Sequence, residues 1–585
     1  MQPPRLLLGY LRSNWYKYAA AILAITVANV VQSIYPRVLG DFTDTLHAGG
    51  ITREAIVDSS LKLLAIGLTF GLLTAVGQFV IMKLGRRFEF VTRQKLFVHF
   101  TRLSETYYSK HGVGQLLSYV MNDVTSVRES ISMGINQTTN AVILILSVMF
   151  MMSISSIPLY LIVTCMVPLL AIPFVVVLFG RPIRQRSLKV QESLAKMTET
   201  AEEQFGGIRV TKKFAVEPVM RERFGRTVDR VADNQLRLVR MSSLFQALLP
   251  FLGGLSLIVA IAFGGFLTIQ GSITIGHFVS LTLYLRMIVN PLQQIGNVIN
   301  TMQRSRASLT RLSDLLAVQP DIRESERAAP LKRGASDIRI SGLSFTYPGS
   351  AQKALDNIEL TVPAGRTLGI IGKTGSGKTT LVKLLLRVYE PPEGTIRIGG
   401  QDIRHATLES LRTQIGYVPQ DGFLFSTTIR DNIAFSNRSS AAEPAYKAAK
   451  QAQIYDNIMQ FPEQFETKLG ERGITLSGGQ RQRTSLARGF LKEAPILVLD
   501  DSVSAVDAVT ETDIIDSLRA ERSDKTTIII AHRISAIKHA DEIVVLDKGA
   551  VVQRGTHEQL IAQQGIYASL YAIQEEGTRH AAGEA

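Results

Sequence analysis

The sequence lacks the features on which secreted and disordered proteins depend. One cysteine (Cys165) and one tryptophan occur among its 585 residues, and charged residues make up 19% of the chain. A single cysteine cannot form an internal disulfide, so a small disulfide-stabilised scaffold is excluded. The hydrophobic content of 46% excludes an intrinsically disordered chain, and the charged fraction lies below the roughly 25% of an average soluble domain.

The apolar residues are concentrated in six segments of the first half. A helix needs about 20 apolar residues to cross the hydrocarbon core of a membrane, and in a bilayer only helices or closed barrels satisfy the backbone. Each segment is too long for a strand, so we predict six transmembrane helices. The predicted spans are Tyr18–Tyr35, Leu63–Met82, Gly134–Met152, Ile157–Gly180, Leu244–Ile269 and Ile275–Ile299.

The loops between these segments account for the net charge of +14. Lys83–Ser130 contains eight Lys and Arg residues and Arg181–Ser243 contains fourteen, whereas the turns at Ser153–Ser156 and Gly271 carry none. The positive-inside rule places both long loops in the cytoplasm, together with the N-terminus. The sequence therefore indicates a multi-pass protein of a bacterial plasma membrane, and the charge gives no reason to expect nucleic-acid binding.

Two further stretches favour helix outside the membrane. Ile183–Phe205 contains neither Gly nor Pro and is rich in helix-forming residues, so we expect the membrane helices to extend well into the cytosol. Arg5–Trp15 has the pattern of a short amphipathic helix lying on the membrane surface.

The character of the chain changes after about Leu316. Gln319–Asp337 is charged and contains Pro320, Pro330 and Gly334, which is typical of a linker, and short β-rich runs then alternate with helical stretches. We predict a helical membrane domain (1–318), a linker (319–337), an α/β P-loop domain (338–575) and a loose tail (576–585).

A phosphate-binding motif lies near the start of the predicted α/β domain. Gly372–Thr379 fits the pattern G-x-x-x-x-G-K-[ST], between a predicted strand (Thr367–Ile371) and a predicted helix (Thr379–Tyr389). Its N–H groups and the helix N-terminus would hold the phosphates of ATP, Lys378 would reach the β- and γ-phosphates, and Thr379 would ligate Mg²⁺. The nucleotide-binding residues predicted here are Gly372, Thr374, Gly375, Ser376, Gly377, Lys378, Thr379 and Thr380.

A second apolar run, Ile496–Leu499, ends in Asp500 and Asp501. A buried strand that delivers a carboxylate at its C-terminal end is what a Mg²⁺–nucleotide site requires. We therefore assign Asp500 to the metal.

The pentapeptide Leu476-Ser477-Gly478-Gly479-Gln480 lies directly before a predicted helix. Two glycines allow a backbone to approach a ligand closely. The pentapeptide resembles the signature motif of ATP-binding cassette (ABC) transporters, and six helices followed by such a cassette resemble an ABC exporter half-transporter of the type IV fold. The resemblance implies that Ser477, Gly478, Gly479 and Gln480 bind ATP across a dimer.

The resemblance also implies roles for other residues. Tyr347 resembles the aromatic residue that stacks on adenine, Gln420 the glutamine that senses Mg²⁺ and couples to the membrane helices, and His532 the histidine that contacts the γ-phosphate. Ser504–Asp507 resembles the D-loop, and Glu471–Gly473 the exporter X-loop.

Asp501 departs from the family pattern. Active cassettes carry a Glu after the metal-binding Asp, and that Glu polarises the attacking water. Asp is one methylene shorter, and a misplacement of about 1 Å can cost on the order of a hundredfold in rate. Either Asp501 replaces Glu in a working site or, as we expect, this subunit forms a slow, degenerate site and lends its signature motif to a competent partner. The second reading resembles the BmrC-type subunit of heterodimeric bacterial multidrug exporters.

The predicted function is ATP-driven export of amphipathic compounds by a heterodimer, with a second half-transporter as partner. Alternatives are export of lipids or peptides, and an ATP-binding regulatory membrane subunit with little turnover. Gly114–Asp123 and Glu203–Phe214 resemble the exporter coupling segments. Arg286 and a set of amides are candidates for cargo contacts or for helix–helix hydrogen bonds. The amides are Asn29, Gln32, Gln78, Asn136, Gln137, Asn140, Asn290, Gln293, Gln294 and Asn297.

Overall fold

The computed structural model describes residues 5–49, 52–326, 328–334, 336–437, 442–470, 473, 476–504 and 506–583. For residues 5, 6, 295–297, 299, 300 and 576–583 only the backbone is described. The chain divides into two compact units. The first comprises residues 1–101 and 112–318, and the second comprises residues 102–111 and 319–585.

The first unit is helical, as predicted. Its helices are α1 (Arg5–Ser13), α2 (Trp15–His47), α3 (Arg53–Phe100), α5 (Val113–Ser118), α6 (Val124–Glu129), α7 (Ile135–Ile154), α8 (Leu159–Gly206), α9 (Ile208–Phe214), α10 (Glu217–Val259), α11 (Gly265–Ile269) and α12 (Ile275–Ala317). Short π-helical turns at Tyr119–Asp123, Ser130–Gly134 and Ala260–Gly264 connect α5 to α6, α6 to α7 and α10 to α11.

Five helical stretches of the described chain are long and apolar enough to cross a membrane. They are α2, α3, Val113–Ile154, α8 and Glu217–Ile269. The sixth predicted span, Ile275–Ile299, is helical within α12 but is not one of these five. Its apolar run is interrupted by Arg286, Asn290 and Gln294, which recur every four residues and therefore fall on one face of the helix.

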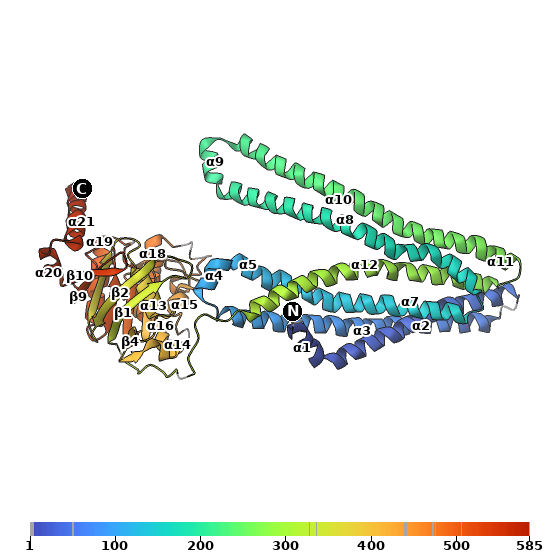
Figure 1. Ribbon diagram of the computed structural model, residues 1–585, viewed down its shortest axis with the longest axis horizontal. Coiled ribbons are helices and arrows are strands. Elements are labelled where there is room, and N and C mark those ends of the chain that lie inside the picture. The colour runs from blue at the N-terminus through green and yellow to red at the C-terminus, as the bar shows by residue number, and fades with distance from the viewer. Residues whose placement is uncertain are drawn as a thin grey trace. The chain divides into compact units, whose positions relative to one another are not determined.

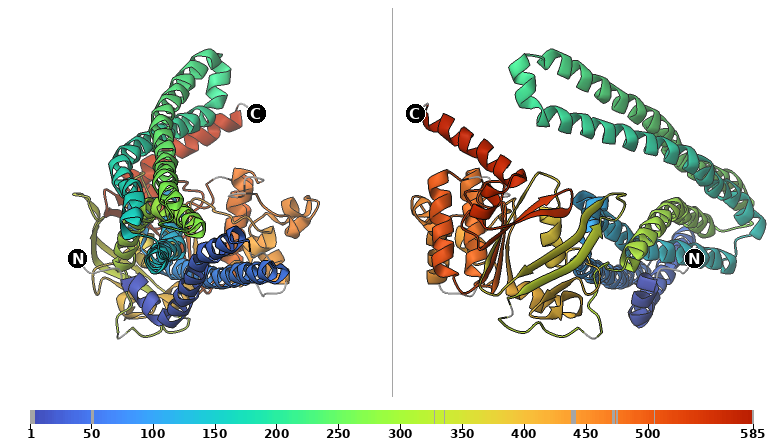
Figure 2. Two further views of the ribbon diagram at one scale, coloured as in Figure 1. Left: turned by 90° about the vertical axis from the view of Figure 1, so that its right-hand side faces the viewer. Right: turned by 60° about the vertical axis from the view of Figure 1, so that its left-hand side comes forward.

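The core of the first unit lies among α7, α8, α10 and α12. Leu161, Leu169 and Leu281 are fully buried there, and the Ser256 hydroxyl donates a hydrogen bond of 2.6 Å to the Cys165 carbonyl. Helices α8 and α10 run side by side as a long hairpin with α9 at its turn (Figures 1 and 2). Helix α8 continues through Ile183–Phe205, as the helix-forming composition of that stretch predicts.

The second unit contains two sheets. Its strands are β1 (Ile338–Thr346), β2 (Lys353–Val362), β3 (Thr367–Gly372), β4 (Ile396–Ile398), β5 (Gln401–Asp402), β6 (Ile415–Val418), β7 (Ile496–Asp500), β8 (Thr526–Ile530), β9 (Glu542–Asp547) and β10 (Ala550–Gly555). An antiparallel sheet has the order β2-β1-β4-β5, and a six-stranded sheet has the order β10-β9-β3-β8-β7-β6.

The strands of the six-stranded sheet are continuous apolar runs in the sequence because both faces of the sheet are buried. Side chains alternate between two cores: Ile496 and Val498 of β7 pack in one, and Leu497 and Leu499 pack in the other. Strands buried on both faces need apolar residues at every position. Because β3, β7 and β8 are parallel, their carboxyl ends meet at one edge, where ligands bind in such sheets.

The helices of the second unit complete the fold around these sheets. They are α4 (Glu105–His111), α13 (Lys378–Leu385), α14 (Leu408–Gln414), α15 (Ile429–Ile433), α16 (Ala442–Gln451), α17 (Tyr455–Met459), α18 (Gly478–Leu491), α19 (Ala508–Glu521), α20 (His557–Ala562) and α21 (Ile566–Gly583). Two differ from expectation. Helix α13 ends at Leu385 rather than Tyr389, and α21 continues as helix into the predicted tail.

One segment of the first long loop belongs to the second unit. This segment is Arg102–His111, which lies upstream of the coupling segment predicted at Gly114–Asp123. The Glu105 carboxylate of α4 forms an ion pair of 2.6 Å with the Lys383 ammonium of α13. The Ser104 hydroxyl donates a hydrogen bond to the Asp321 carboxylate. Gly114–Asp123 instead folds as α5 and a π-helical turn of the first unit.

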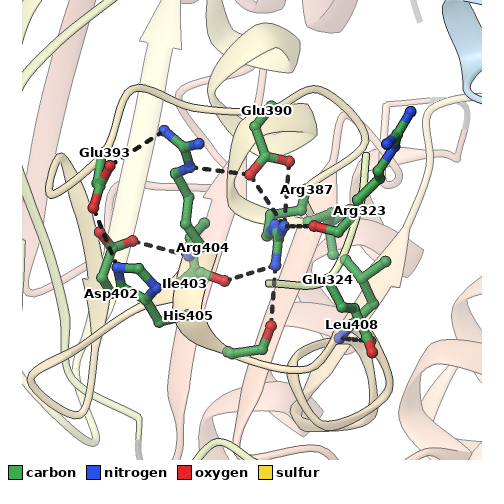
Figure 3. Close-up of polar contacts among 12 residues, drawn as sticks. Arg323, Glu324, Arg387, Glu390, Glu393, Asp402, Ile403, Arg404, His405 and Leu408 are labelled. Carbon is green, nitrogen blue, oxygen red and sulfur yellow. Dashed lines mark hydrogen bonds and ion pairs between the residues drawn. The ribbon is translucent and has the colours of Figure 1, made fainter. Parts of the chain in front are cut away.

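The predicted linker is bound tightly to the second unit (Figure 3). The guanidinium of Arg387, which is fully buried, donates to the carbonyls of Ile403, Ala406 and Arg323 and forms an ion pair of 3.0 Å with Glu390.

Neighbouring contacts reinforce this attachment. The Glu324 carboxylate accepts from the Leu408 amide at 2.7 Å, and Ala329 exchanges main-chain hydrogen bonds with His405 and Thr407. Most of the linker is therefore part of the folded second unit.

Candidate nucleotide site

The phosphate loop connects β3 to α13 and depends on left-handed glycines. Gly375 has φ +81° and Gly377 has φ +101°, a region that side chains disfavour. A Cβ on Gly377 would lie 2.6 Å from the Ala354 carbonyl oxygen, whereas a Cβ on Gly375 would meet no atom within 4 Å. The loop therefore packs against β2 on one side and is open on the other.

Lys378 lies at the first position of α13 and folds back over the loop. Its ammonium donates to the carbonyls of Gly372 at 2.7 Å and Lys373 at 3.0 Å. Burial lowers the pKa of this ammonium, and the nearby carboxylates of Asp501 and Asp500 oppose that shift. Its position at the start of the helix is suited to a phosphate, since helix N-termini favour anions.

Asp500 ends β7 and faces the start of α13. Its carboxylate lies 3.3 Å from the Thr379 hydroxyl and 3.4 Å from the Tyr417 hydroxyl. Burial raises the pKa of Asp500, and the two hydroxyls oppose that shift. One carboxylate and one hydroxyl are hard oxygen donors of the kind that Mg²⁺ takes together with phosphates and water, so these residues fit the metal.

Asp501 follows directly and has a left-handed backbone, with φ +49°. One carboxylate oxygen accepts a hydrogen bond of 3.1 Å from the Gln420 amide, and the other is buried without a partner in the described part of the chain. Its carbonyl accepts from Gln482 and Ser504, each at 3.0 Å. A buried carboxylate oxygen without a donor is rare and is available to a water molecule.

The remaining predicted residues lie around this edge of the sheet. The Tyr347 hydroxyl lies 2.9 Å from the Thr380 hydroxyl, and its ring packs edge-on against Phe345 and Tyr389. His532 follows β8 with an exposed side chain, and its carbonyl accepts from Gln574.

The signature segment caps α18. The Ser477 hydroxyl accepts from the Gln480 amide, and the Gln480 side chain accepts from the Ser477 amide, which together form a capping box. Ser477 and Gly478 are exposed, and a Cβ on Gly478 would meet nothing within 4 Å. Among the described residues, no hydrogen bond joins this segment to the phosphate loop of the same chain.

Two residues that contact the aspartates were not predicted, and three predicted residues lie outside the described part of the chain. Gln482 and Tyr417 contact the two aspartates, and both lie beside predicted residues, Gln482 in the same helix as Gln480 and Tyr417 three residues before Gln420. Glu471 and Arg472 of the predicted X-loop, and Ala505 of the predicted D-loop, lie outside the described residues.

Comparison with known proteins agrees with this geometry. The sequence model of the ABC transporter transmembrane region matches residues 18–292, and that of the ABC transporter cassette matches residues 355–504. A solved bacterial Atm1-family ABC exporter with ATP bound superposes with a TM-score of 0.81 at 27% identity, over 96% of this chain and 99% of that one.

Curated relatives are similar over nearly their whole length. A probable multidrug resistance ABC transporter ATP-binding/permease protein, YheI of Bacillus subtilis, is 36% identical, covering 97% of this chain and 96% of the relative. The ATP-dependent lipid A-core flippase of Syntrophus aciditrophicus is 33% identical, covering 97% of this chain and 94% of the relative. The multidrug resistance-like ATP-binding protein MdlA of Escherichia coli is 30% identical, covering 97% of this chain and 95% of the relative. The chain therefore belongs to the ABC exporters, membrane proteins in which a helical transmembrane region is joined to an ATP-hydrolysing cassette.

Proposed function

We propose that this chain is one subunit of a heterodimeric exporter of amphipathic compounds, and that its own ATP site turns over slowly. The observation that carries the proposal is the environment of Asp501. Its short side chain is buried, and one oxygen is already held by Gln420. The oxygen without a partner can accept from water, but it lies one methylene short of the reach of a glutamate.

The chemistry follows from the positions of the other residues. Lys378 and the loop amides bind and orient the phosphates, and bound Mg²⁺ would neutralise their charge from the side of Asp500 and Thr379. Gln420 fixes Asp501 by donating to its carboxylate. We assign the exposed His532, which follows β8, to the γ-phosphate as a hydrogen-bond donor.

Two exposed surfaces support a second subunit. The signature segment presents Ser477 and Gly478 to solvent and makes no hydrogen bond to its own phosphate loop among the described residues. Phe205 and Phe214, at the two ends of the α8–α10 turn, are each 74% exposed. Aromatic side chains exposed in the cytosol indicate a docking surface, and we assign it to the cassette of the partner half-transporter.

The names of the relatives support drugs or lipids as cargo. Both YheI and MdlA are described as multidrug proteins, and the Syntrophus protein is described as a lipid flippase. We assign the chain to drug-like amphipathic cargo and to the bacterial plasma membrane, with lipid export as the alternative.

Replacing Asp501 tests the proposal directly. In the purified chain, Asp501→Glu is expected to raise ATP hydrolysis by about tenfold or more, since it restores the missing methylene. Asp513→Glu, the same change at an exposed position of α19, is the control and should leave the rate unchanged. Rapid hydrolysis by the unmodified chain as a homodimer would contradict the proposal.

Co-purification with the native partner gives an independent test. The companion chain should carry Glu after its metal-binding Asp, and the pair should accumulate cargo inside inverted membrane vesicles when ATP is added to the medium. A pair that binds ATP but moves no cargo would instead support the regulatory alternative.

A further inference from the structure

A polar cavity lies within the helical first unit. Its volume is about 470 Å³, and residues of α2, α3, α7 and α12 line it. The polar side chains that line it are Gln32, Tyr35, Asn140, Arg286, Asn290 and Gln294. The remainder of the wall is aromatic or aliphatic. Apolar side chains together with a few convergent polar groups are the usual lining of a small-molecule site.

Arg286 is the charged residue of this cavity. It is exposed to the cavity rather than packed in the core, and no ion pair to it exists among the described residues. A cation at membrane depth is costly unless it is paired or reaches water, and residues of this kind mark substrate or ion pathways. Arg286 therefore calls for a counter-charge that the described part of this chain does not provide.

The amides around Arg286 extend the polar surface in one direction. Asn290 and Gln294 follow Arg286 at intervals of four residues, so the three side chains form one stripe along α12. Asn140 of α7 and Gln32 of α2 line the same cavity from the neighbouring helices. A guanidinium flanked by amide donors suits a carboxylate, sulfonate or phosphate group, which guanidinium binds with two parallel hydrogen bonds.

We propose that this cavity binds the anionic group of a small amphipathic cargo, with Arg286 as the counter-charge and the apolar wall holding the hydrophobic part. The proposal rests on the export function proposed above and specifies its cargo class. The volume lies within the roughly 300–1,000 Å³ of sites for drug-sized ligands, which favours a small organic anion over a lipid with several acyl chains.

A pair of fluorescent probes separates charge from hydrophobicity. Anilinonaphthalene sulfonate carries an anionic group, and phenylnaphthylamine is its uncharged analogue. Binding is measured by titrating the full-length protein, purified with its partner in nucleotide-free detergent micelles. Arg286→Gln is expected to weaken sulfonate binding by about tenfold and to change phenylnaphthylamine binding by less than twofold. Arg286→Lys keeps the positive charge, so its affinity for the sulfonate probe should fall less than that of Arg286→Gln.

The control is Arg304→Gln, which removes a cation from the same helix outside the cavity and should leave both affinities unchanged. Equal sulfonate binding in Arg286→Gln and Arg304→Gln would overturn the proposal, as would an equal loss for both probes. If Arg286→Gln does not assemble, the double change Asn290→Ala with Gln294→Ala should weaken sulfonate binding several-fold, and unchanged binding would overturn it.

Competition identifies the source of the anionic group. Displacement of the sulfonate probe by octyl sulfonate would support a solute anion, and displacement only by lysophosphatidate would support an acidic single-chain lipid bound by the same chemistry. Equal displacement by zwitterionic lysophosphatidylcholine would contradict an anion site. Because these titrations contain no ATP, their failure leaves the hydrolysis test of Asp501→Glu unaffected, and the two proposals can fail separately.

Discussion

The glycines and aspartates at the edge of the six-stranded sheet show how much depends on single residues. Gly377 approaches the Ala354 carbonyl so closely that no side chain fits without displacing backbone. Asp500 and Asp501 are adjacent in sequence, yet one contacts two hydroxyls and the other a glutamine amide. These neighbouring carboxylates thus have different hydrogen-bond partners.

Two glycine substitutions separate steric clash from backbone strain. Gly377→Ala and Gly375→Ala both place a side chain at positive φ, which costs on the order of 1–3 kcal/mol, but only Gly377→Ala also meets the Ala354 carbonyl. In the nucleotide-free protein, the melting temperature of Gly377→Ala should therefore fall further than that of Gly375→Ala. Equal melting temperatures would contradict the packing described.

The sequence predicts the residues of this edge because their signals are local. The phosphate loop is a continuous motif between a strand and a helix, and Asp500 ends an apolar run that must be buried. The contact from Gln482 to the Asp501 carbonyl was not predicted, because it depends on how α18 packs beside β7. The place of Arg102–His111 in the second unit likewise depends on tertiary contacts, such as the pair of Glu105 with Lys383.

At the scale of elements, the attachment of the linker depends on Arg387. Arg387→Leu would leave the carbonyls of Ile403 and Ala406 without their donor and Glu390 without its buried partner. Losing such a network costs about 3 kcal/mol, so the second unit should melt several degrees lower, by scanning fluorimetry of the full-length protein. Arg397→Leu removes an exposed cation from β4 and serves as the control; equal shifts would refute the role of Arg387.

Helices α20 and α21 are joined by a titratable contact. His557 Nδ1 lies 2.7 Å from the Tyr567 hydroxyl. Burial lowers the pKa of His557 below its ordinary 6.5, with Lys538 acting in the same direction and Glu558 opposing. His539, nearby, also has a lowered pKa, chiefly through burial.

The sign of the pH effect follows from these lowered pKa values. Above about pH 7.5 both histidines are neutral in the folded and in the unfolded chain. They therefore add no pH dependence to the free energy of unfolding in that range. As the pH falls through 6.5 the unfolded chain binds protons first, and stability should decrease until the folded pKa values are passed. His557→Gln should flatten this decrease in melting temperature between pH 7.5 and 5; an unaltered slope would exclude His557 as a cause.

At the scale of the whole molecule, the signature segment and the aromatic residues around α9 are exposed. The second cassette that we propose would cover both surfaces. The double change Phe205→Ser with Phe214→Ser should abolish ATP-driven transport by the assembled pair while leaving the melting temperature of the chain nearly unchanged. Ile573→Ser, at an exposed position of α21, is the control. Full transport by the double variant would contradict this docking surface.

The attachment of residues 321–331 to the cassette limits where the chain can bend. Helix α12 ends at Ala317, and the Ser104–Asp321 hydrogen bond already belongs to the second unit. Between the end of α12 and the second unit, the chain can therefore bend only within the few residues from Val318 to Pro320. Because this connection between α12 and the cassette is only three residues long, we expect a nucleotide-driven motion of the cassette to be transmitted to α12, the helix that carries Arg286.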